Sequence, residues 1–218
     1  HDPETGFVYL PTEAPTGDYY GGHRHGNNLF STSIVCLDSK TGERVWHFQT
    51  IHHDIWDWDN PSAPILADLV IDGVERKIVA LITKQGFVFV FDRLTGDPIW
   101  PIEERPVPQT DTPGEWTSPT QPFPTKPAPF DRQGFSEDDL IDFTPELRAQ
   151  AAEVASRYRM GPIYAPPSLA NHPDGTNGML SLPTSTGGSN WEGGALDPET
   201  GHIYIGSYTR AAVLGLVE

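Results

Sequence analysis

The chain has 218 residues, of which 37% are hydrophobic, so it can bury a core of ordinary domain size despite its 22 prolines and 21 glycines. Its formal charge of -16 would repel the phosphates of nucleic acids and anionic lipid headgroups, which argues against a nucleic-acid partner. The high content of proline, glycine and aromatic residues predicts an all-β protein made of short strands joined by turns.

A turn motif recurs along the chain and predicts a repeated unit. Residues 38–46 (DSKTGERVW) return as residues 92–100 (DRLTGDPIW), and the shorter form DPETG occurs at 2–6 and again at 197–201. In such a turn the Asp bonds its own backbone, while the Gly accepts a positive φ angle. Repeats of this kind are typical of propeller blades or of another β array.

The length of the chain limits how many blades it can contain. A blade is a four-stranded sheet of about 40–50 residues, so this chain holds about three or four of them. We therefore expect a partial β-propeller, a fragment of a longer protein whose remaining blades are its partners. The blades should occupy residues 1–101 and 176–218 of one domain, and a different segment, 102–175, should interrupt them.

The interrupting segment has two parts. Residues 102–129 are rich in proline and threonine and should form an extended strap on the surface, because proline lacks the donor that a sheet interior requires. An amphipathic helix should follow, with Thr144 as N-cap, Pro145 in its first turn and its end near Arg159. We expect the apolar face of this helix to pack on the propeller.

The densest group of reactive side chains lies at residues 52–61 (HHDIWDWDNP). Three interpretations compete: a general base beside a metal, a metal site, and a polar corner in which buried Asp and His satisfy one another. An Asp between two Trp rings is shielded from water, which raises its pKa, and a nearby cation would lower it again. His53 and Asp54 could orient this base or could be core residues, and Asp59, just before a turn, is expected to be structural.

Two further segments could bind a ligand. Lys84 is the single charged residue of an otherwise apolar pair of strands, and taken alone it favours a position in solvent at a strand end over contact with an anionic ligand. Residues 186–195 (TGGSNWEGGA) combine glycines with Asn190 and Trp191. These residues could let the backbone approach a ligand closely, or they could form a tight turn that leads into the next strand.

Taken together, several motifs resemble the pyrroloquinoline-quinone-dependent dehydrogenases, in particular the membrane-type glucose dehydrogenase branch with its polyol and quinate enzymes. The resemblance covers nearly the whole chain, and His53-Asp54-Ile55-Trp56-Asp57 is its most specific element. It implies an eight-bladed propeller with the quinone near its axis, over Ca²⁺ or a related ion such as Mg²⁺. By the same resemblance, Asp57 is the catalytic base, Lys84 contacts the quinone oxygens, and Asn190 and Trp191 approach the cofactor.

One position departs from the family pattern. Many members carry an Asn that ligates the metal at the place where this chain has Ala14, whose side chain cannot ligate. Either Glu13 takes over as an oxygen ligand beside Asp57, or other parts of the protein hold the ion.

The resemblance implies that the protein oxidises a sugar or polyol by hydride transfer to the quinone and passes electrons to ubiquinone or a cytochrome. It implies a periplasmic location, with an anchor to the inner membrane through a preceding segment. We expect the isolated chain to have little or no activity. The alternatives are a non-catalytic quinoprotein-like scaffold for protein partners and, less favoured, a glycoside hydrolase that uses Asp54 and Asp57.

Overall fold

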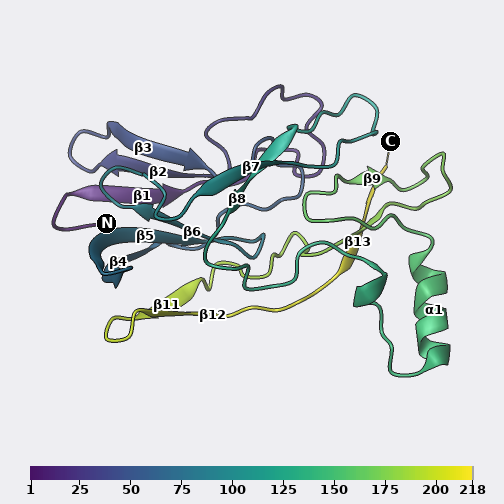
Figure 1. Cartoon of the computed structure of the whole chain (residues 1–218). Helices are drawn as coiled ribbons and strands as arrows, with labels where there is room; N and C mark the ends of the chain where they lie inside the picture. The colour runs from purple at the N-terminus through teal and green to yellow at the C-terminus, as the bar shows by residue number, and fades with distance from the viewer. Residues whose placement is uncertain (218) are drawn as a thin grey trace.

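The structure is a computed structural model that describes residues 1–217. Its N-terminal half contains two antiparallel three-stranded sheets that lie beside each other (Figure 1). The first sheet consists of β1 (Phe7–Pro11), β2 (Ser33–Asp38) and β3 (Arg44–Gln49). The second consists of β4 (Ile65–Ile71), β5 (Val74–Ile82) and β6 (Val88–Asp92).

The first repeated turn joins β2 to β3, and the second follows β6 and leads to a bridge between Phe91 and Pro98; both have the expected geometry. Asp38 accepts hydrogen bonds from the backbone N–H groups two and three residues later, at 2.8 and 3.1 Å, and Asp92 does the same at 2.9 and 3.1 Å. Gly42 and Gly96 have φ angles of 74° and 78°, which an L side chain adopts only with strain. The prediction of a repeated strand-turn-strand unit is confirmed.

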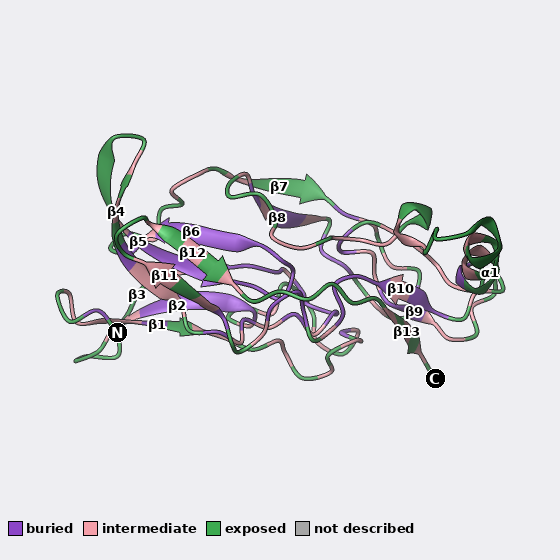
Figure 2. Ribbon diagram, turned by 90° about the horizontal axis from the view of Figure 1, so that it is seen from below, coloured by how far each residue is buried: buried purple, intermediate pink, exposed green. Residues whose placement is uncertain are grey.

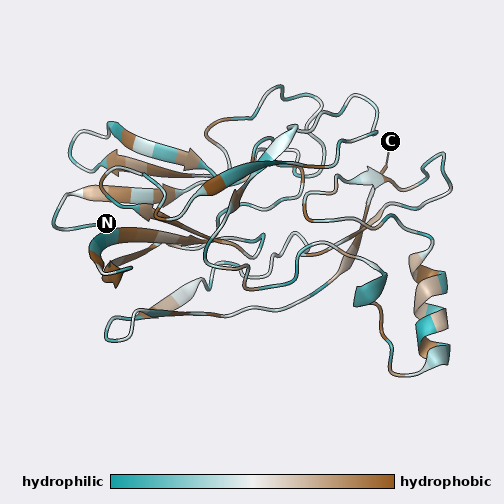
Figure 3. Cartoon of the chain, in the orientation of Figure 1, coloured by the Kyte–Doolittle hydropathy of each residue, from teal (hydrophilic) through white to brown (hydrophobic). Residues whose placement is uncertain are grey.

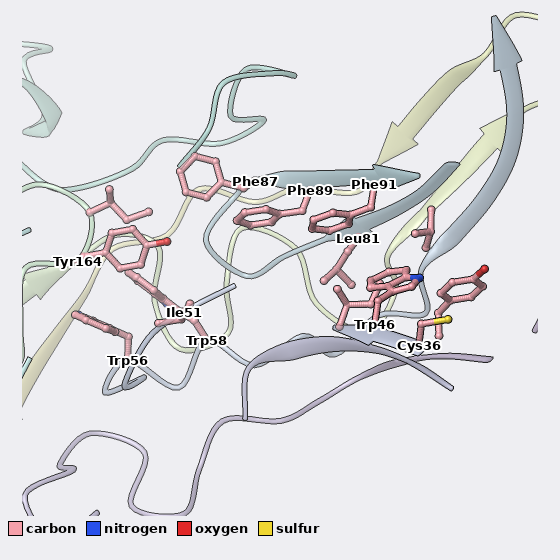
Figure 4. Packing of buried hydrophobic residues seen from close by; sticks show 14 of the residues in the cluster. Cys36, Trp46, Ile51, Trp56, Trp58, Leu81, Phe87, Phe89, Phe91 and Tyr164 are labelled. Carbon is pink, nitrogen blue, oxygen red and sulfur yellow. The ribbon is translucent and has the colours of Figure 1, made fainter. Parts of the chain in front are cut away.

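The Trp of the first repeat joins the two sheets. Trp46 is buried between Tyr9 and Phe91, and its indole N–H donates to the carbonyl of Arg93, 3.2 Å away. The aromatic residues of β6 continue this contact toward the middle of the molecule (Figure 4). The tryptophan therefore ties one repeat to the turn of the next.

The rest of the described chain contains smaller sheets. They are the pair β7 (Ile102–Pro106) and β8 (Thr120–Pro124), the pair β11 (Gly194–Asp197) and β12 (His202–Ile205), and the sheet of β9 (Ser168–Leu169), β10 (Met179–Ser181) and β13 (Ala212–Leu216). The β11–β12 pair adjoins β4. The prediction of an all-β fold is confirmed.

The proline-rich strap differs from the expectation. It forms the β7–β8 ladder, in which Pro106, Pro122 and Pro124 take part, and Gln121 is fully buried. Both strands of a two-stranded ladder are edges, so each proline can face away from the partner without breaking a ladder bond. The strap is therefore an element docked on the molecule, with an exposed β7 and a largely buried β8 (Figure 2).

The expected helix is present as α1 (Pro145–Ala155), and Thr144 caps it by accepting from the backbone of Leu147 at 3.2 Å. It ends four residues before Arg159. The expectation that its apolar face packs on the propeller is wrong for most of that face, because Leu147 and Val154 are exposed and Ala155 is its single buried residue. Apolar and polar residues mix around α1, which lies at the opposite end of the molecule from the N-terminus (Figure 3).

A short 3₁₀ helix, Glu137–Asp139, precedes α1. Within residues 1–217, none of the helices has the length and apolar character needed to cross a bilayer.

Candidate active site

The loop between β3 and β4 is held in shape by one buried carboxylate. Asp54 is completely buried and accepts hydrogen bonds from the backbone of Trp56 and Trp58, at 2.9 and 3.2 Å, and from the hydroxyl of Thr32 at 3.0 Å. Burial raises the pKa of Asp54 to about 6, although these hydrogen bonds oppose the shift. Asp54 therefore has a structural role.

Asp57 lies between two buried tryptophans, but its own side chain faces outward. The rings of Trp56 and Trp58 stack with their centroids 5.5 Å apart, and both are almost fully buried. The backbone of Asp57 has a positive φ angle of 58°. The two buried tryptophans thus anchor the loop on the core, while the carboxylate of the residue between them in the sequence stays partly accessible.

Lys84 meets this carboxylate from the turn between β5 and β6. Its ammonium nitrogen lies 3.6 Å from Oδ1 of Asp57, 3.1 Å from Oδ1 of Asp59, and 2.9 Å from the carbonyl oxygen of Asp57, to which it donates. Lys84 is only 6% exposed. The interpretation that places Lys84 in solvent is therefore wrong, because two carboxylates compensate the burial of its charge.

The ionisation of Asp57 reflects three influences. Burial raises its pKa to about 7, the neighbouring Asp59 acts in the same direction, and the Lys84 cation opposes both. A carboxyl group that exchanges its proton near neutral pH is suited to general acid–base chemistry.

Asp59 is a functional candidate that the sequence reasoning placed in a structural turn. The structure pairs it with Lys84 at 3.1 Å, on the same side of the loop as Asp57. The signal in the sequence was a second carboxylate only two residues after Asp57, close enough for one cation to meet both.

The glycine-rich loop lies against the main chain of Lys84. Gly188 donates its N–H to the carbonyl of Lys84 at 2.9 Å, and a Cβ atom on Gly187 would lie 2.6 Å from Cγ of Lys84. Trp58 donates its indole N–H to Thr184 at 3.0 Å, which fixes the start of this loop beside the Asp57 loop. Close approach of backbone to Lys84 explains the need for glycine here.

Asn190 and Trp191 lie at the end of this loop. The Asn190 amide donates to the carbonyl of Thr186 at 2.9 Å, and Trp191 is 75% exposed. The structure thus brings the loop that carries them to Lys84, and within residues 1–217 no hydrogen bond joins either side chain to Lys84 or Asp57.

Glu13 is exposed, and among the described residues its carboxylate takes part in no hydrogen bond or ion pair with Asp57. Nor do residues 1–217 contain a group of three or more His, Cys, Asp or Glu side chains arranged to hold a metal ion. The donor set of the described residues therefore does not form a complete metal site.

The strap reaches the site through two side chains that the sequence reasoning did not select. Gln121 accepts from the backbone N–H of His52 at 2.8 Å and donates to its carbonyl at 2.7 Å. Glu115 lies 3.2 Å from Nε2 of His53, and the side chains of both residues are 1% exposed. The sequence gives little sign of either contact, because Gln121 and Glu115 each lie more than 60 residues from the histidine that they contact.

The chain is similar to known proteins over nearly its entire length. Residues 1–218 match the PQQ family, described as the β-propeller domain of glucose, ethanol and alcohol dehydrogenases. Quinate/shikimate dehydrogenase (quinone) of Acinetobacter baylyi is 33% identical over 94% of the chain and 25% of its own length. Quinoprotein glucose dehydrogenase A of Acinetobacter calcoaceticus is 36% identical over 91% of the chain and 25% of its own length.

Among solved structures, the quinohemoprotein alcohol dehydrogenase ADHIIG of Pseudomonas putida HK5 has a similar fold, with a TM-score of 0.64 and 24% identity over 100% of this chain and 26% of that chain. This likeness confirms that the fold is part of a β-propeller. The chain spans about a quarter of the length of these relatives. From the match over residues 1–218, the chain belongs to the pyrroloquinoline quinone (PQQ) dehydrogenase family of β-propeller proteins.

Proposed function

We propose that this chain is the part of a quinoprotein dehydrogenase that carries the catalytic base, and that the whole protein oxidises a hydroxyl group of a sugar or polyol. The observation that carries the proposal is the contact of the buried Lys84 with Asp57 and Asp59. A buried cation beside a half-buried carboxylate has no evident structural need in a scaffold. Relatives of this chain include dehydrogenases of glucose and of quinate or shikimate.

In the proposed reaction Asp57 removes the proton of the substrate hydroxyl. Its pKa near 7 lets it be ionised in a large fraction of molecules at neutral pH and still hold a proton well once it has taken one. Lys84 keeps the carboxylate in place and lowers its pKa toward the ionised form. Trp56 and Trp58 exclude water from the base of the loop.

The residues present fit an anionic quinone. When bound, PQQ supplies an electrophilic carbonyl group that accepts the hydride from the substrate carbon. Lys84 offers the positive charge that would hold its oxygens, and the glycine-rich loop brings Asn190 and the exposed indole of Trp191 to the same end of the site. A buried ammonium, an amide and a flat aromatic face are suited to a planar acidic ligand.

We further propose that Ca²⁺ or Mg²⁺ binds at Asp57 together with ligands from outside this chain, and we derive no step through it, since the described donor set is incomplete. The expectation that Glu13 contributes to this site stays a prediction. The proposed location is the periplasm, with ubiquinone or a cytochrome as electron acceptor. The remaining blades are proposed to complete the single propeller domain to which residues 1–101 and 176–218 contribute.

The test is a titration of the full-length protein with PQQ, followed by tryptophan fluorescence. Lys84→Ala is expected to weaken PQQ binding by at least tenfold. Lys40→Ala, which changes an exposed lysine in the first repeated turn, should leave it unchanged. Absence of saturable PQQ binding to the wild-type protein would contradict the proposal and favour a scaffold role.

A further inference from the structure

A tyrosine lies near the oxygen of the Asp57 carboxylate that does not face Lys84. The hydroxyl oxygen of Tyr19 lies 3.5 Å from Oδ2 of Asp57, whereas the Lys84 ammonium lies 3.6 Å from Oδ1. A good hydrogen bond between two oxygen atoms is about 2.7–2.8 Å long, so the contact with Tyr19 is a loose one. The phenol therefore lies next to the proposed base without forming a strong hydrogen bond to it.

The segment that carries Tyr19 is held in place by the strap. The carboxylate of Glu115 accepts hydrogen bonds from the backbone N–H of Gly21 and from that of Trp116, the latter at 2.7 Å, and it lies 3.2 Å from Nε2 of His53. Burial would raise the pKa of Glu115, but these hydrogen bonds outweigh it and lower the pKa, so the group is anionic at neutral pH. Nδ1 of His53 lies 2.7 Å from the carbonyl oxygen of Gly26, so His53 links Gly26 to Glu115, which binds Gly21 directly.

The backbone of this segment packs closely on His53 and on the strap. A Cβ atom on Gly21 would collide with the imidazole of His53, and one on Gly22 would collide with the carbonyl of Gly114. Tyr20 donates its hydroxyl hydrogen to the carbonyl of Pro113, 3.2 Å away. The strap thus fixes the main chain on the C-terminal side of Tyr19, which sets the position of the phenol.

We propose that Tyr19 is a specificity-determining residue that binds the substrate oxygen next to the one that Asp57 deprotonates. This inference rests on the proposed function. A phenol both donates and accepts hydrogen bonds, so it can bind a hydroxyl group in either orientation. The substrate class that matches a base and a phenol side by side is a polyol or sugar with hydroxyl groups on adjacent carbons. A simple alcohol leaves the Tyr19 hydroxyl without a partner.

The experiment compares Tyr19→Phe with Tyr204→Phe in the full-length protein loaded with PQQ. Each variant loses one phenol oxygen, but Tyr204 lies exposed on β12, away from the segment that carries Tyr19. Two substrate pairs are used, D-glucose with 2-deoxy-D-glucose and glycerol with propan-1-ol. Only the first member of each pair has a hydroxyl group beside the reacting carbon.

Tyr19→Phe is expected to lower kcat/KM for D-glucose or glycerol by roughly tenfold, as loss of one well-placed hydrogen bond does, and to change the value for the deoxy partner by less than threefold. Tyr204→Phe should leave the ratio within each pair unchanged. As a readout independent of turnover, Tyr19→Phe should weaken the binding of 1,5-anhydro-D-glucitol, measured by calorimetry, by a similar factor, while the dissociation constant for PQQ stays the same.

Equal losses on both members of each pair, or no loss at all, would overturn the role of Tyr19 while leaving the proposed function intact. A wild-type protein that binds PQQ but oxidises none of the four compounds would overturn the assigned substrate class and the inference with it.

Discussion

The indole ring of Trp46 occupies the space beside Gly96 that a side chain at that position would need. A Cβ atom built on Gly96 would lie 2.6 Å from ring carbon Cδ2 of Trp46, well inside van der Waals contact. Because Gly96 belongs to the turn of the second repeat and Trp46 to the end of the first, this contact sets the spacing between two neighbouring sheets.

Gly96→Ala should therefore destabilise the protein more than Gly42→Ala. Both glycines have positive φ angles, at 78° and 74°, so both substitutions strain the backbone alike. A Cβ atom on Gly42 would meet nothing within 4 Å, whereas one on Gly96 would push Trp46 away. We expect an additional loss of about 1–3 kcal/mol in the free energy of unfolding for Gly96→Ala, measured with urea on the intact protein. Equal losses of unfolding free energy in the two variants would mean that Trp46 can move aside without cost.

The repeats explain why the sequence predicted the fold well. The turn residues Asp38 and Gly42 act on backbone atoms within a few positions, so their roles can be read from local sequence. Thr144 predicted the start of α1 for the same reason. The burial of β8 was harder to predict, because the buried Gln121 forms its hydrogen bonds with the backbone of His52, which lies 69 residues earlier in the chain.

The site was predictable only in part for the same physical reason. Asp57 stood out because two tryptophans flank it in the sequence. The burial of Lys84 depends on carboxylates from another loop. The residues next to Lys84 in the sequence do not reveal these partners, so the local sequence suggested an exposed lysine. Glu115 lies in a proline-rich segment without periodicity, and nothing local predicts its bond to His53.

Asp57→Asn should abolish most of the turnover of the full-length enzyme. Asparagine has nearly the same shape but cannot accept the substrate proton, so we expect kcat to fall by about 10²–10⁴-fold. Asp72→Asn is a matched control, because Asp72 also has a positive φ angle, 51° against 58°, and lies exposed at the turn between β4 and β5. Retention of most activity by Asp57→Asn would exclude Asp57 as the base.

The stability of the fold should depend on the ionisation of Asp54. Its pKa rises from 3.8 to about 6 on folding, chiefly because of burial. The folded state thus holds this proton more tightly than the unfolded state, so the contribution of Asp54 to stability is largest below pH 3.8 and declines as the pH rises through about 6. A shift of this size corresponds to about 3 kcal/mol at most.

Asp54→Asn, which cannot ionise, removes this contribution. The loss of unfolding free energy that the substitution causes should therefore be smaller at pH 7 than at pH 4, as measured by urea unfolding of both proteins at each pH. Other titrating groups affect both proteins and cancel in the comparison. An equal loss at the two pH values would show that Asp54 ionises alike in the folded and unfolded states.

Gly187→Ala should weaken PQQ binding through its effect on Lys84. A Cβ atom on Gly187 would lie 2.6 Å from Cγ and 2.7 Å from Cα of Lys84, so either the loop or the lysine must shift and the ammonium loses its position beside Asp57. Gly175→Ala is the control, because Gly175 also has a positive φ angle, 90° against 77°, and has open space around it. We expect the dissociation constant of the full-length protein for PQQ to rise by roughly tenfold for Gly187→Ala alone, which corresponds to about 1.4 kcal/mol. If the two variants bind PQQ alike, the glycine-rich loop does not fix Lys84, and its glycines serve the turn into β11 instead.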